Sequence, residues 1–370
     1  MMNITQNNLN TLKACRYCPM CRQACPSEFI SYRESDAPRG RAILLHGVYQ
    51  GGKEFDVSTI DSIYNCFLCG ACKSWCSGHE LGGYDIPELI KFARKDIVSK
   101  GLAPQIVQDI RNSLVTNDNT RNMDRNLSYT ASVTEKKADV LYILGEGVNY
   151  TNPDIAEAFI RVLENCKVNY TLLKDEPTSG KELELLGYEE EAREKATNMA
   201  GRIESTGCKK IVVSDPLVYD VLKNQYPAWG IEVKAEILHV SEYLLELISS
   251  GELKLKQTNE KITLADSEFL GRYNDVYEAP RKVIKTSAGS QFFEMQWNHE
   301  YLQSAGEAAI TFNGNSFNKG KELGRKISQK AEDINAETIV TLSATAKDNI
   351  AETTRLKVLD IAEFVNENIG

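Results

Sequence analysis

Two cysteine-rich runs carry the most specific chemistry of this sequence. In each run, successive cysteines are separated by two, two and three residues, and the second run begins 51 residues after the first. Three thiolates at this spacing, in a tight irregular turn, can each cap one iron of a 4Fe-4S cluster. The runs contain eight of the ten cysteines: Cys15, Cys18, Cys21 and Cys25, then Cys66, Cys69, Cys72 and Cys76. We therefore expect two 4Fe-4S clusters with these thiolates as ligands.

The fourth cysteine of each run is expected to bind the cluster of the other run. In two-cluster ferredoxins the fourth cysteine, usually followed by proline, ligates the neighbouring cluster. The predicted sets are Cys15, Cys18, Cys21 and Cys76 for one cluster, and Cys66, Cys69, Cys72 and Cys25 for the other. Pro26 follows the first run, whereas Ser77 follows the second. This departure could loosen the turn without removing a ligand.

Zinc and disulfides are the alternatives that the cysteines leave open. Structural zinc is usually held by two separated pairs of cysteines, which three evenly spaced thiols match poorly. A disulfide framework needs an oxidising compartment and is typical of short secreted chains. Arginines at 16, 22, 33, 39 and 41 surround the first run in sequence. They either offset the negative charge of a tetrathiolate cluster and raise its potential, or are ordinary solvated side chains.

Length and composition indicate a globular protein of two or three domains. The chain has 370 residues, of which 42% are hydrophobic and 26% charged, and a net charge of -9. Binding to nucleic acid would need a basic surface, so we expect none. We found neither a leader-like start nor 18 consecutive apolar residues, so we expect a cytoplasmic protein with no membrane span. Peripheral membrane association through a partner remains compatible with this pattern.

The rest of the sequence predicts helices near the amino end and alternating strands and helices after residue 137. Asp85 and Pro87 open a helix with helical apolar spacing, and the cap candidates Ser58 and Thr59 open a shorter one. Strands are expected at 140–144, 168–173 and 211–214, with a helix at 188–205. The predicted domains are 1–115, a linker at 116–136, and two α/β modules at 137–257 and 258–370. Alternating strands and helices predict mostly parallel sheets.

Internal similarity supports the division into two modules. The strand around residue 211 matches the one around residue 339, and the segment beginning at His239 matches the one beginning near Asp360, an offset of about 120 to 130 residues. Cys166 and Cys208 lie outside the runs and are expected to be small buried residues. The four histidines, His46, His79, His239 and His299, show no ligand or catalytic spacing.

With these features together, the chain resembles the iron-sulfur subunits of glycolate oxidase, anaerobic glycerol-3-phosphate dehydrogenase and heterodisulfide reductase D. The resemblance rests on both cysteine runs, on the Pro38-Arg39-Gly40-Arg41 loop and on a duplicated α/β half. It implies an α+β multidomain fold: an N-terminal α-helical ferredoxin-like domain with two 4Fe-4S clusters, followed by two modules with "CCG" motifs. Parts of the motif scaffold are present at Gly145, Pro177, Gly180, 213–216, Asp266, 270–272 and Gly306.

The cysteines of those CCG motifs are missing. Where the resemblance would place thiols, the first module has Glu146, Thr178, Ser179, Asp215 and Val218, and the second has Glu268, Ser304, Ala305, Ser343 and Ala346. Hydroxyls, carboxylates and alanines do not replace the soft thiolates that iron-sulfur centres need. We therefore expect degenerate modules without a metal centre in residues 137–370. A docking platform is favoured there over a residual small-molecule pocket.

The resemblance implies an electron-transfer subunit rather than a catalytic one. The expected donor is an FAD-containing dehydrogenase that oxidises a 2-hydroxy acid or glycerol 3-phosphate, and the expected acceptor is a quinone or an electron carrier such as an electron-transfer flavoprotein. An alternative is a scaffold and electron wire in a larger heterodisulfide-reductase-like or flavin-bifurcating assembly. A third reading, an autonomous enzyme that reduces a thiol substrate, is disfavoured by the missing cysteines.

Overall fold

The structure of the protein is a computed structural model that describes residues 5–76, 78, 84–309 and 316–370, with side chains from residue 319 onward in the last stretch. The expectations about Ser77 and His79 lie outside the described residues. None of the helices in the described ranges is both long and apolar enough to cross a lipid bilayer.

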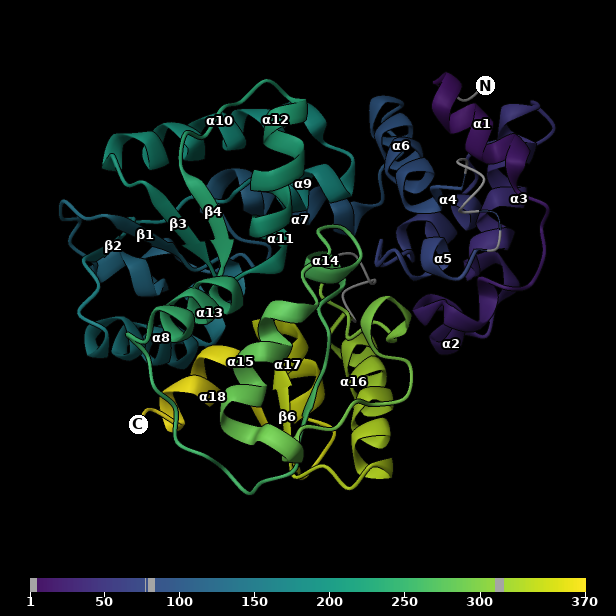
Figure 1. Ribbon diagram of the computed structural model, residues 1–370. Coiled ribbons are helices and arrows are strands. Elements are labelled where there is room, and N and C mark those ends of the chain that lie inside the picture. The colour runs from purple at the N-terminus through teal and green to yellow at the C-terminus, as the bar shows by residue number, and fades with distance from the viewer. Residues whose placement is uncertain (1–4, 77, 79–83, 310–315) are drawn as a thin grey trace.

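The amino-terminal part is helical, and it forms the purple and blue body on the right of Figure 1. Asp85 caps its longest helix by accepting a hydrogen bond from the Glu88 amide at 3.1 Å, as the sequence predicted. The cap of the shorter helix that begins at Val57 was predicted wrongly. Asp56, and not Ser58 or Thr59, is its cap and accepts from the Thr59 amide at 2.8 Å. The helices are α1 (Gln6–Ala14), α2 (Pro26–Ser31), α3 (Pro38–Tyr49), α4 (Val57–Tyr64), α5 (Ala71–Ser74), α6 (Ile86–Ser99) and α7 (Gln105–Asn117).

A parallel sheet follows, with helices on both of its faces, on the left of Figure 1. Its strands are β1 (Val140–Ile143), β2 (Tyr170–Leu172), β3 (Lys210–Val213) and β4 (Glu236–His239), in the order β2-β1-β3-β4. The first three confirm the strand predictions. The helices are α8 (Pro153–Asn165), α9 (Lys181–Leu186), α10 (Glu189–Thr206), α11 (Pro216–Asp220), α12 (Tyr226–Ala228) and α13 (Val240–Ser250). A parallel sheet needs this cover because both its faces are apolar.

The carboxyl-terminal part contains a smaller parallel sheet. Its described strands are β5 (Ile262–Leu264), β6 (Thr338–Thr341) and β7 (Lys357–Asp360), in that order. The accompanying helices are α14 (Glu268–Gly271), α15 (Glu278–Ala288), α16 (Ser316–Asp333), α17 (Ala344–Ala351) and α18 (Ile361–Glu367). The chain is therefore a mixed helix and sheet protein, which agrees with the coarse fold prediction.

The ends of the two sheets are built alike. β4 runs directly into α13 through His239, and β7 runs directly into α18 through Asp360. Both residues cap their helix, and in each case a glutamate three residues later accepts a hydrogen bond from the amide of the cap residue, at 2.8 Å. These are two of the positions that sequence similarity paired.

The two α/β parts share a large apolar cluster, and the second part has a further, smaller cluster of its own. Phe159 of α8 and Leu244 of α13 belong to the same buried cluster as Ile284 of α15 and Phe364 of α18. The helical body is joined in a similar way, because Leu183 and Leu186 of α9 pack into its core beside Ile90. The parts of the chain are consequently held together by buried apolar surface.

The predicted linker is partly buried. Asn119 and Thr130 have no exposed surface, and the Thr130 amide donates to the Asn149 side chain at 3.0 Å. The segment contains two short 3-10 turns, at Arg125–Leu127 and Tyr129–Ser132. Residues 116–136 thus connect the helical body to the first sheet and form hydrogen bonds with residues that follow β1 and with β2.

Substitution of Gly187 by alanine tests the contact between the end of α9 and α6. Both Gly187 and Gly207 end a helix with a positive φ, at 99° and 65°, so alanine at either should cost about 1 kcal/mol of left-handed strain. A Cβ on Gly187 would also meet the Arg94 backbone at 2.6 Å, whereas a Cβ on Gly207 meets nothing within 4 Å. We expect Gly187→Ala to lower the free energy of unfolding by about 1–3 kcal/mol more than Gly207→Ala. Equal losses in anaerobic urea unfolding would contradict the contact.

Candidate iron-sulfur centre and the adjoining pocket

The two cysteine runs adopt the same irregular turn. The residue two positions after the first cysteine of each run, Tyr17 or Leu68, has a left-handed backbone with φ of 54°. Cys15 ends α1 and Cys25 precedes α2, while Cys66 follows α4 and Cys72 lies in α5. The turns therefore hold the thiols on irregular backbone between short helices.

The fold brings the eight thiols together around two adjoining cavities. The first has a volume of about 250 Å³ and is lined by Cys15, Cys18, Cys21, Cys72 and Cys76. The second is narrower, about 20 Å³, and is lined by Cys25, Cys66, Cys69 and Cys72. The last cysteine of each run thus lies with the thiols of the other run, and Cys72 borders both cavities.

The thiols are costly to ionise without a cation. Burial, together with repulsion from the neighbouring Cys15 and Cys25 thiolates, raises the pKa of Cys21 to about 12. Burial likewise raises the pKa of Cys69, to which the negative charge of Glu268 adds. Bound iron removes this cost, because ligation keeps thiols deprotonated. The donor set therefore fits a positively charged inorganic core.

The arrangement fits a cluster better than a single metal ion. In the described part of the chain, no three His, Cys, Asp or Glu side chains converge closely enough to ligate one ion. A 4Fe-4S cluster takes one thiolate on each of its irons, so its ligands surround a larger body than a zinc ion does.

Of the arginines near the first run, Arg41 is the one buried beside a predicted ligand. Only 1% of its surface is exposed, and its Nη1 lies 3.8 Å from the Cys25 sulfur. Its Nε donates to the Ser62 carbonyl at 2.7 Å and its Nη2 to the Ser27 hydroxyl at 3.1 Å. The arginines at 22, 33 and 39 instead form ion pairs with Glu28, with Asp36 and Asp61, and with Glu34. Among these arginines, Arg41 is thus the buried one in direct contact with a thiol.

Side chains from the helical body and from the second α/β part hold the backbone of the second run. Arg272, after α14, donates to the Cys69 carbonyl at 2.9 Å, and the Tyr273 hydroxyl donates to the Leu68 carbonyl at 2.6 Å. Arg94 of α6 donates to the Cys66 carbonyl at 2.6 Å and to the Leu185 carbonyl at 2.7 Å. The second run is therefore held by Arg94 of the helical body, which also contacts the first α/β part, and by two residues of the second α/β part.

Comparison with known proteins agrees with this geometry. Residues 11–79 match the model of a 4Fe-4S dicluster domain. The chain is 26% identical to the D component of a dihydromethanophenazine:CoB--CoM heterodisulfide reductase from Methanosarcina barkeri, over 100% of this chain and 96% of that protein. It is 30% identical to a protein named "Probable iron-sulfur-binding oxidoreductase FadF" from Bacillus subtilis, over 66% of this chain. The chain belongs to the iron-sulfur subunit family of heterodisulfide reductase D and glycolate oxidase.

Family membership agrees with the prediction of an iron-sulfur, electron-transferring oxidoreductase subunit that binds 4Fe-4S clusters. The chain spans 37% of the Bacillus protein and 36% of an EtfAB:quinone oxidoreductase from Syntrophomonas wolfei, to which it is 28% identical over 67% of this chain. A solved structure of a hypothetical protein from Helicobacter pylori has the same fold, with a TM-score of 0.62 at 10% identity, over 100% of this chain and 73% of that one.

Polar side chains occupy several of the positions at which the resemblance would place CCG thiols. In the second part, the Glu268 carboxylate accepts hydrogen bonds from the Ser304 hydroxyl and, at 3.0 Å, from the Gly306 amide. Ser343 caps α17 by accepting from the Ala346 amide. In the first part, Asp215 caps α11, accepting from the Leu217 amide at 2.7 Å. Polar side chains at these positions therefore serve the fold as caps and turn partners.

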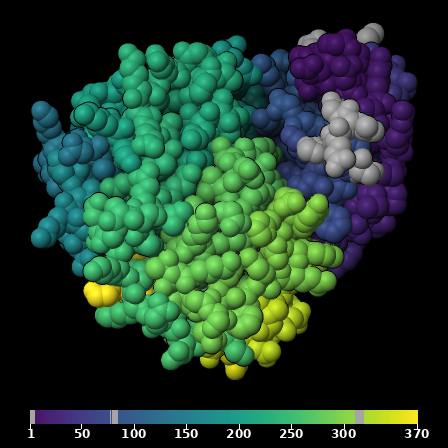
Figure 2. All heavy atoms as spheres, viewed as in Figure 1, coloured from purple at the N-terminus to yellow at the C-terminus, as the bar shows by residue number. Residues whose placement is uncertain are grey.

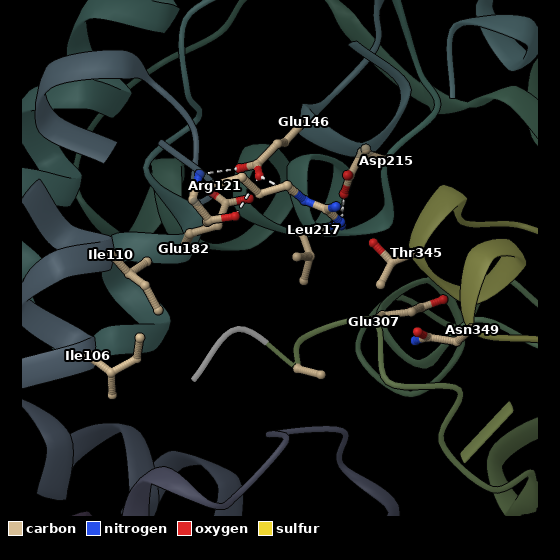
Figure 3. Close-up of a pocket in the computed structure, with 13 residues that line it drawn as sticks. Ile106, Ile110, Arg121, Glu146, Glu182, Asp215, Leu217, Glu307, Thr345 and Asn349 are labelled. Carbon is tan, nitrogen blue, oxygen red and sulfur yellow. Dashed lines mark hydrogen bonds and ion pairs between the residues drawn. The ribbon is translucent and has the colours of Figure 1, made fainter. Parts of the chain in front are cut away.

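A cavity of about 300 Å³ lies at the junction of the two α/β parts, as Figure 3 shows. Glu146, after β1, and Asp215, after β3, reach it from the carboxyl ends of neighbouring parallel strands, and Glu182 reaches it from the first turn of α9. Side chains of the second α/β part and two isoleucines of α7 complete the lining. The full lining is Ile106, Ile110, Thr120, Arg121, Glu146, Gly147, Glu182, Asp215, Leu217, Glu307, Ala309, Thr345 and Asn349.

The carboxyl groups of the cavity have strongly perturbed pKa values. Burial, with repulsion from Glu146 and Asp215, raises the pKa of Glu182 to about 8. Burial raises the pKa of Asp215 to about 6. Burial and the nearby Glu268 raise the pKa of Glu307 well above its ordinary range. These groups are expensive to keep ionised side by side in an interior.

Sequence reasoning missed part of this site. The sequence does not single out Glu182, because it fits the amphipathic pattern of a short helix. Nor does it single out Glu307, since only the neighbouring Gly306 matches the motif scaffold. His239 is a buried cap residue, as its Nδ1 accepts from the Ser241 amide at 3.1 Å, so it has a structural role. Cys166 and Cys208 are only half-buried, not buried as predicted, because they lie where a helix ends and where a strand begins.

Arg41 should raise the reduction potential of the cluster that Cys25 is proposed to ligate. Reduction adds negative charge, so Arg41→Gln should make reduction harder and lower that potential by on the order of tens of mV. Arg22→Gln is the matched control, because Arg22 is 45% exposed in its side chain and is paired with Glu28 at 2.8 Å. Redox titration followed by electron paramagnetic resonance measures both. An equal or larger shift in the control would contradict the role of Arg41.

Proposed function

We propose that this chain holds two 4Fe-4S clusters and passes electrons between a flavoprotein dehydrogenase and a downstream acceptor. The cluster ligands are Cys15, Cys18, Cys21 and Cys76 for the first, and Cys66, Cys69, Cys72 and Cys25 for the second. The observation that carries this proposal is the exchange of the fourth thiol between the two cavities. Bound clusters would supply one-electron transfer, which none of the protein's own side chains provides.

The surroundings of the two cavities differ in a way that suits a relay. Cys18 is exposed, and its cavity is bordered by Met20, Arg16 and Arg39, so electrons can be exchanged with a partner there. The second cavity is enclosed by Arg41, Phe67 and Leu68. A solvent-facing cluster next to a buried one gives a directed path from the surface to the interior.

The identity of the partners is proposed from the relatives. An FAD-containing dehydrogenase for a 2-hydroxy acid or glycerol 3-phosphate would be the donor, and a quinone or an electron-transfer flavoprotein would be the acceptor. The name of the Syntrophomonas relative, an EtfAB:quinone oxidoreductase, supports an acceptor of this kind. The alternative is a scaffold and electron wire in a larger assembly, which the match across 96% of the Methanosarcina heterodisulfide reductase component favours. Co-purification of a flavoprotein from the native host distinguishes the two.

We also propose the domain organisation expected from the sequence: a helical ferredoxin-like domain at 1–115, a connecting segment at 116–136, and degenerate CCG-like modules at 137–257 and 258–370. The matching strand-to-helix junctions at His239 and Asp360 support a repeat. The shared core implies that the modules fold together rather than independently.

Iron content tests the number of clusters. Protein purified or reconstituted without oxygen should contain about eight irons per chain, four for each cluster. About four irons would remove one cluster, and appreciably more than eight would indicate a further centre in the α/β modules. A colourless, iron-free sample after reconstitution would contradict the function itself.

Cys25→Ser tests the exchange of ligands. The variant should disturb the spectrum of the cluster held mainly by Cys66, Cys69 and Cys72, because Cys25 lines their cavity. Cys208→Ser is the control, since that half-buried thiol lies outside both runs and contacts the Ala138 carbonyl. Mössbauer or electron paramagnetic resonance spectra report each cluster separately. Damage confined to the cluster of Cys15 would show that the exchange is wrong.

A further inference from the structure

A small apolar cluster connects the second cavity with the surface beside α16. Cys69, a proposed ligand of the second 4Fe-4S cluster, is buried in this apolar cluster together with Phe67 and with Leu323 of α16. Trp75, at the end of α5, packs against it and remains partly exposed. Figure 1 shows α16 beside α2, where the second α/β part meets the helical body. The thiols of the second cavity therefore lie close to this surface.

Three aromatic rings meet at the surface. Trp75 contacts Trp297 and Tyr301 edge to face, with 5.4 Å between the ring centroids in both pairs. Trp297 is 38% exposed and Tyr301 is 44% exposed. Trp75 stands between Cys72 and Cys76 in the second run. The rings thus join the turn that carries the proposed ligands to exposed aromatic side chains of the second α/β part.

The segment that carries Trp297 and Tyr301 is fixed to the frame of the second run. Arg272, which donates to the Cys69 carbonyl, also donates through its Nε to the Glu300 carbonyl at 2.9 Å. The His299 amide donates to Asp266 at 2.8 Å, and Asp266 forms an ion pair with the buried Arg281 at 2.6 Å. Tryptophan and tyrosine in such fixed positions lose little conformational freedom on binding and are common anchors of protein interfaces.

Two lysines of α16 lie over neighbouring aromatic rings. The Nζ of Lys330 is 4.3 Å from the centroid of the Trp297 ring, and the Nζ of Lys326 is 4.3 Å from that of Phe29 in α2. The two lysines are four residues apart and therefore share one face of the helix. The Phe29 amide donates to the Cys25 carbonyl at 3.3 Å, so this ring also lies next to a proposed ligand. The surface is consequently both aromatic and basic.

These two lysines keep their charge unpaired. In the described part of the chain neither forms an ion pair, although Lys330 lies 3.4 Å from the Gln296 carbonyl. Asp333, one turn further along α16, accepts from Gln329 at 3.2 Å instead. Residues 310–318, which precede the described side chains of α16, contain no acidic residue. In a chain with a net charge of -9, this is a local basic surface next to the second cavity.

We propose that this surface is the docking face for an acidic flavoprotein that exchanges electrons with the second cluster. The docking face consists of Phe29, Trp75, Trp297, Tyr301, Lys326 and Lys330. Its rings form the apolar centre of the contact, and its lysines pair with carboxylates of the partner at the rim. In each transfer the reduced flavin loses one electron and the oxidised second cluster gains it. The inference rests on the proposed function, and it gives the relay a second exchange point besides the exposed Cys18.

The test uses the full-length, cluster-loaded protein and a reduced flavodoxin, which is a small acidic flavoprotein, under anaerobic conditions. Stopped-flow absorbance measures the second-order rate constant for reduction of the clusters. The rate constant should fall at least about fivefold between about 10 mM and about 300 mM salt, because the salt screens the attraction between the two faces. A rate constant that does not depend on salt would overturn the docking face. Dithionite, a small reductant, serves as the comparison: clusters that dithionite cannot reduce would contradict the proposed function itself.

Variants place the contact on this surface. Lys326→Gln and Lys330→Gln should each lower the rate constant with flavodoxin about threefold at low salt, and Trp297→Ala should lower it about tenfold. Lys209→Gln is the matched control, because Lys209 is an exposed lysine that precedes β3 in the first α/β part. Iron content and reduction by dithionite should stay unchanged in all four variants. Unchanged rates with flavodoxin in both variants of α16, or an equal loss in the control, would overturn the docking face while leaving the proposed function intact.

Discussion

The structure depends on bringing eight mutually repelling thiols, from two runs 51 residues apart, into two adjoining cavities. Burial and repulsion raise the pKa of Cys21 to about 12, so the thiols cannot hold themselves together as anions. The protein offers limited compensation, chiefly the buried guanidinium of Arg41. The helices of this body hold the backbone of the two cysteine runs in place. Bound iron would supply the remaining positive charge.

The second run shows how far this positioning reaches into the molecule. Its carbonyls accept hydrogen bonds from Arg94, Arg272 and Tyr273, and the last two follow α14 in the second α/β module. The second α/β part is therefore needed to hold the second cysteine run. It acts as the wall against which the cluster-bearing turn is held, and Figure 2 shows it in continuous contact with the helical body. Such a wall would also keep the buried cluster out of water.

The same junction explains why carboxylates can stand where thiols are expected. Asp215 and Ser343 cap helices that begin at the ends of parallel strands, and Glu268 satisfies a turn, so each has a local role that needs no metal. Because these strand ends face one another, their polar groups enclose a cavity. The cavity is thereby lined by acidic side chains such as Glu146 and Asp215.

The sequence by itself determined the alternation of strands and helices after residue 137 and helix starts such as that at Asp85, and it supplied the proposal for the cluster ligands. These features are local, because ligand spacing, apolar periodicity and capping act within a few residues. It failed at the cap of α4, where Asp56 rather than Ser58 or Thr59 is the cap and accepts from the Thr59 amide, and at the burial of Cys166. Only the tertiary structure decided that Arg41 alone of the first-run arginines is buried beside a thiol, and that Glu182 and Glu307 share a cavity. Their meeting depends on packing between segments 125 residues apart, and no short-range pattern encodes it.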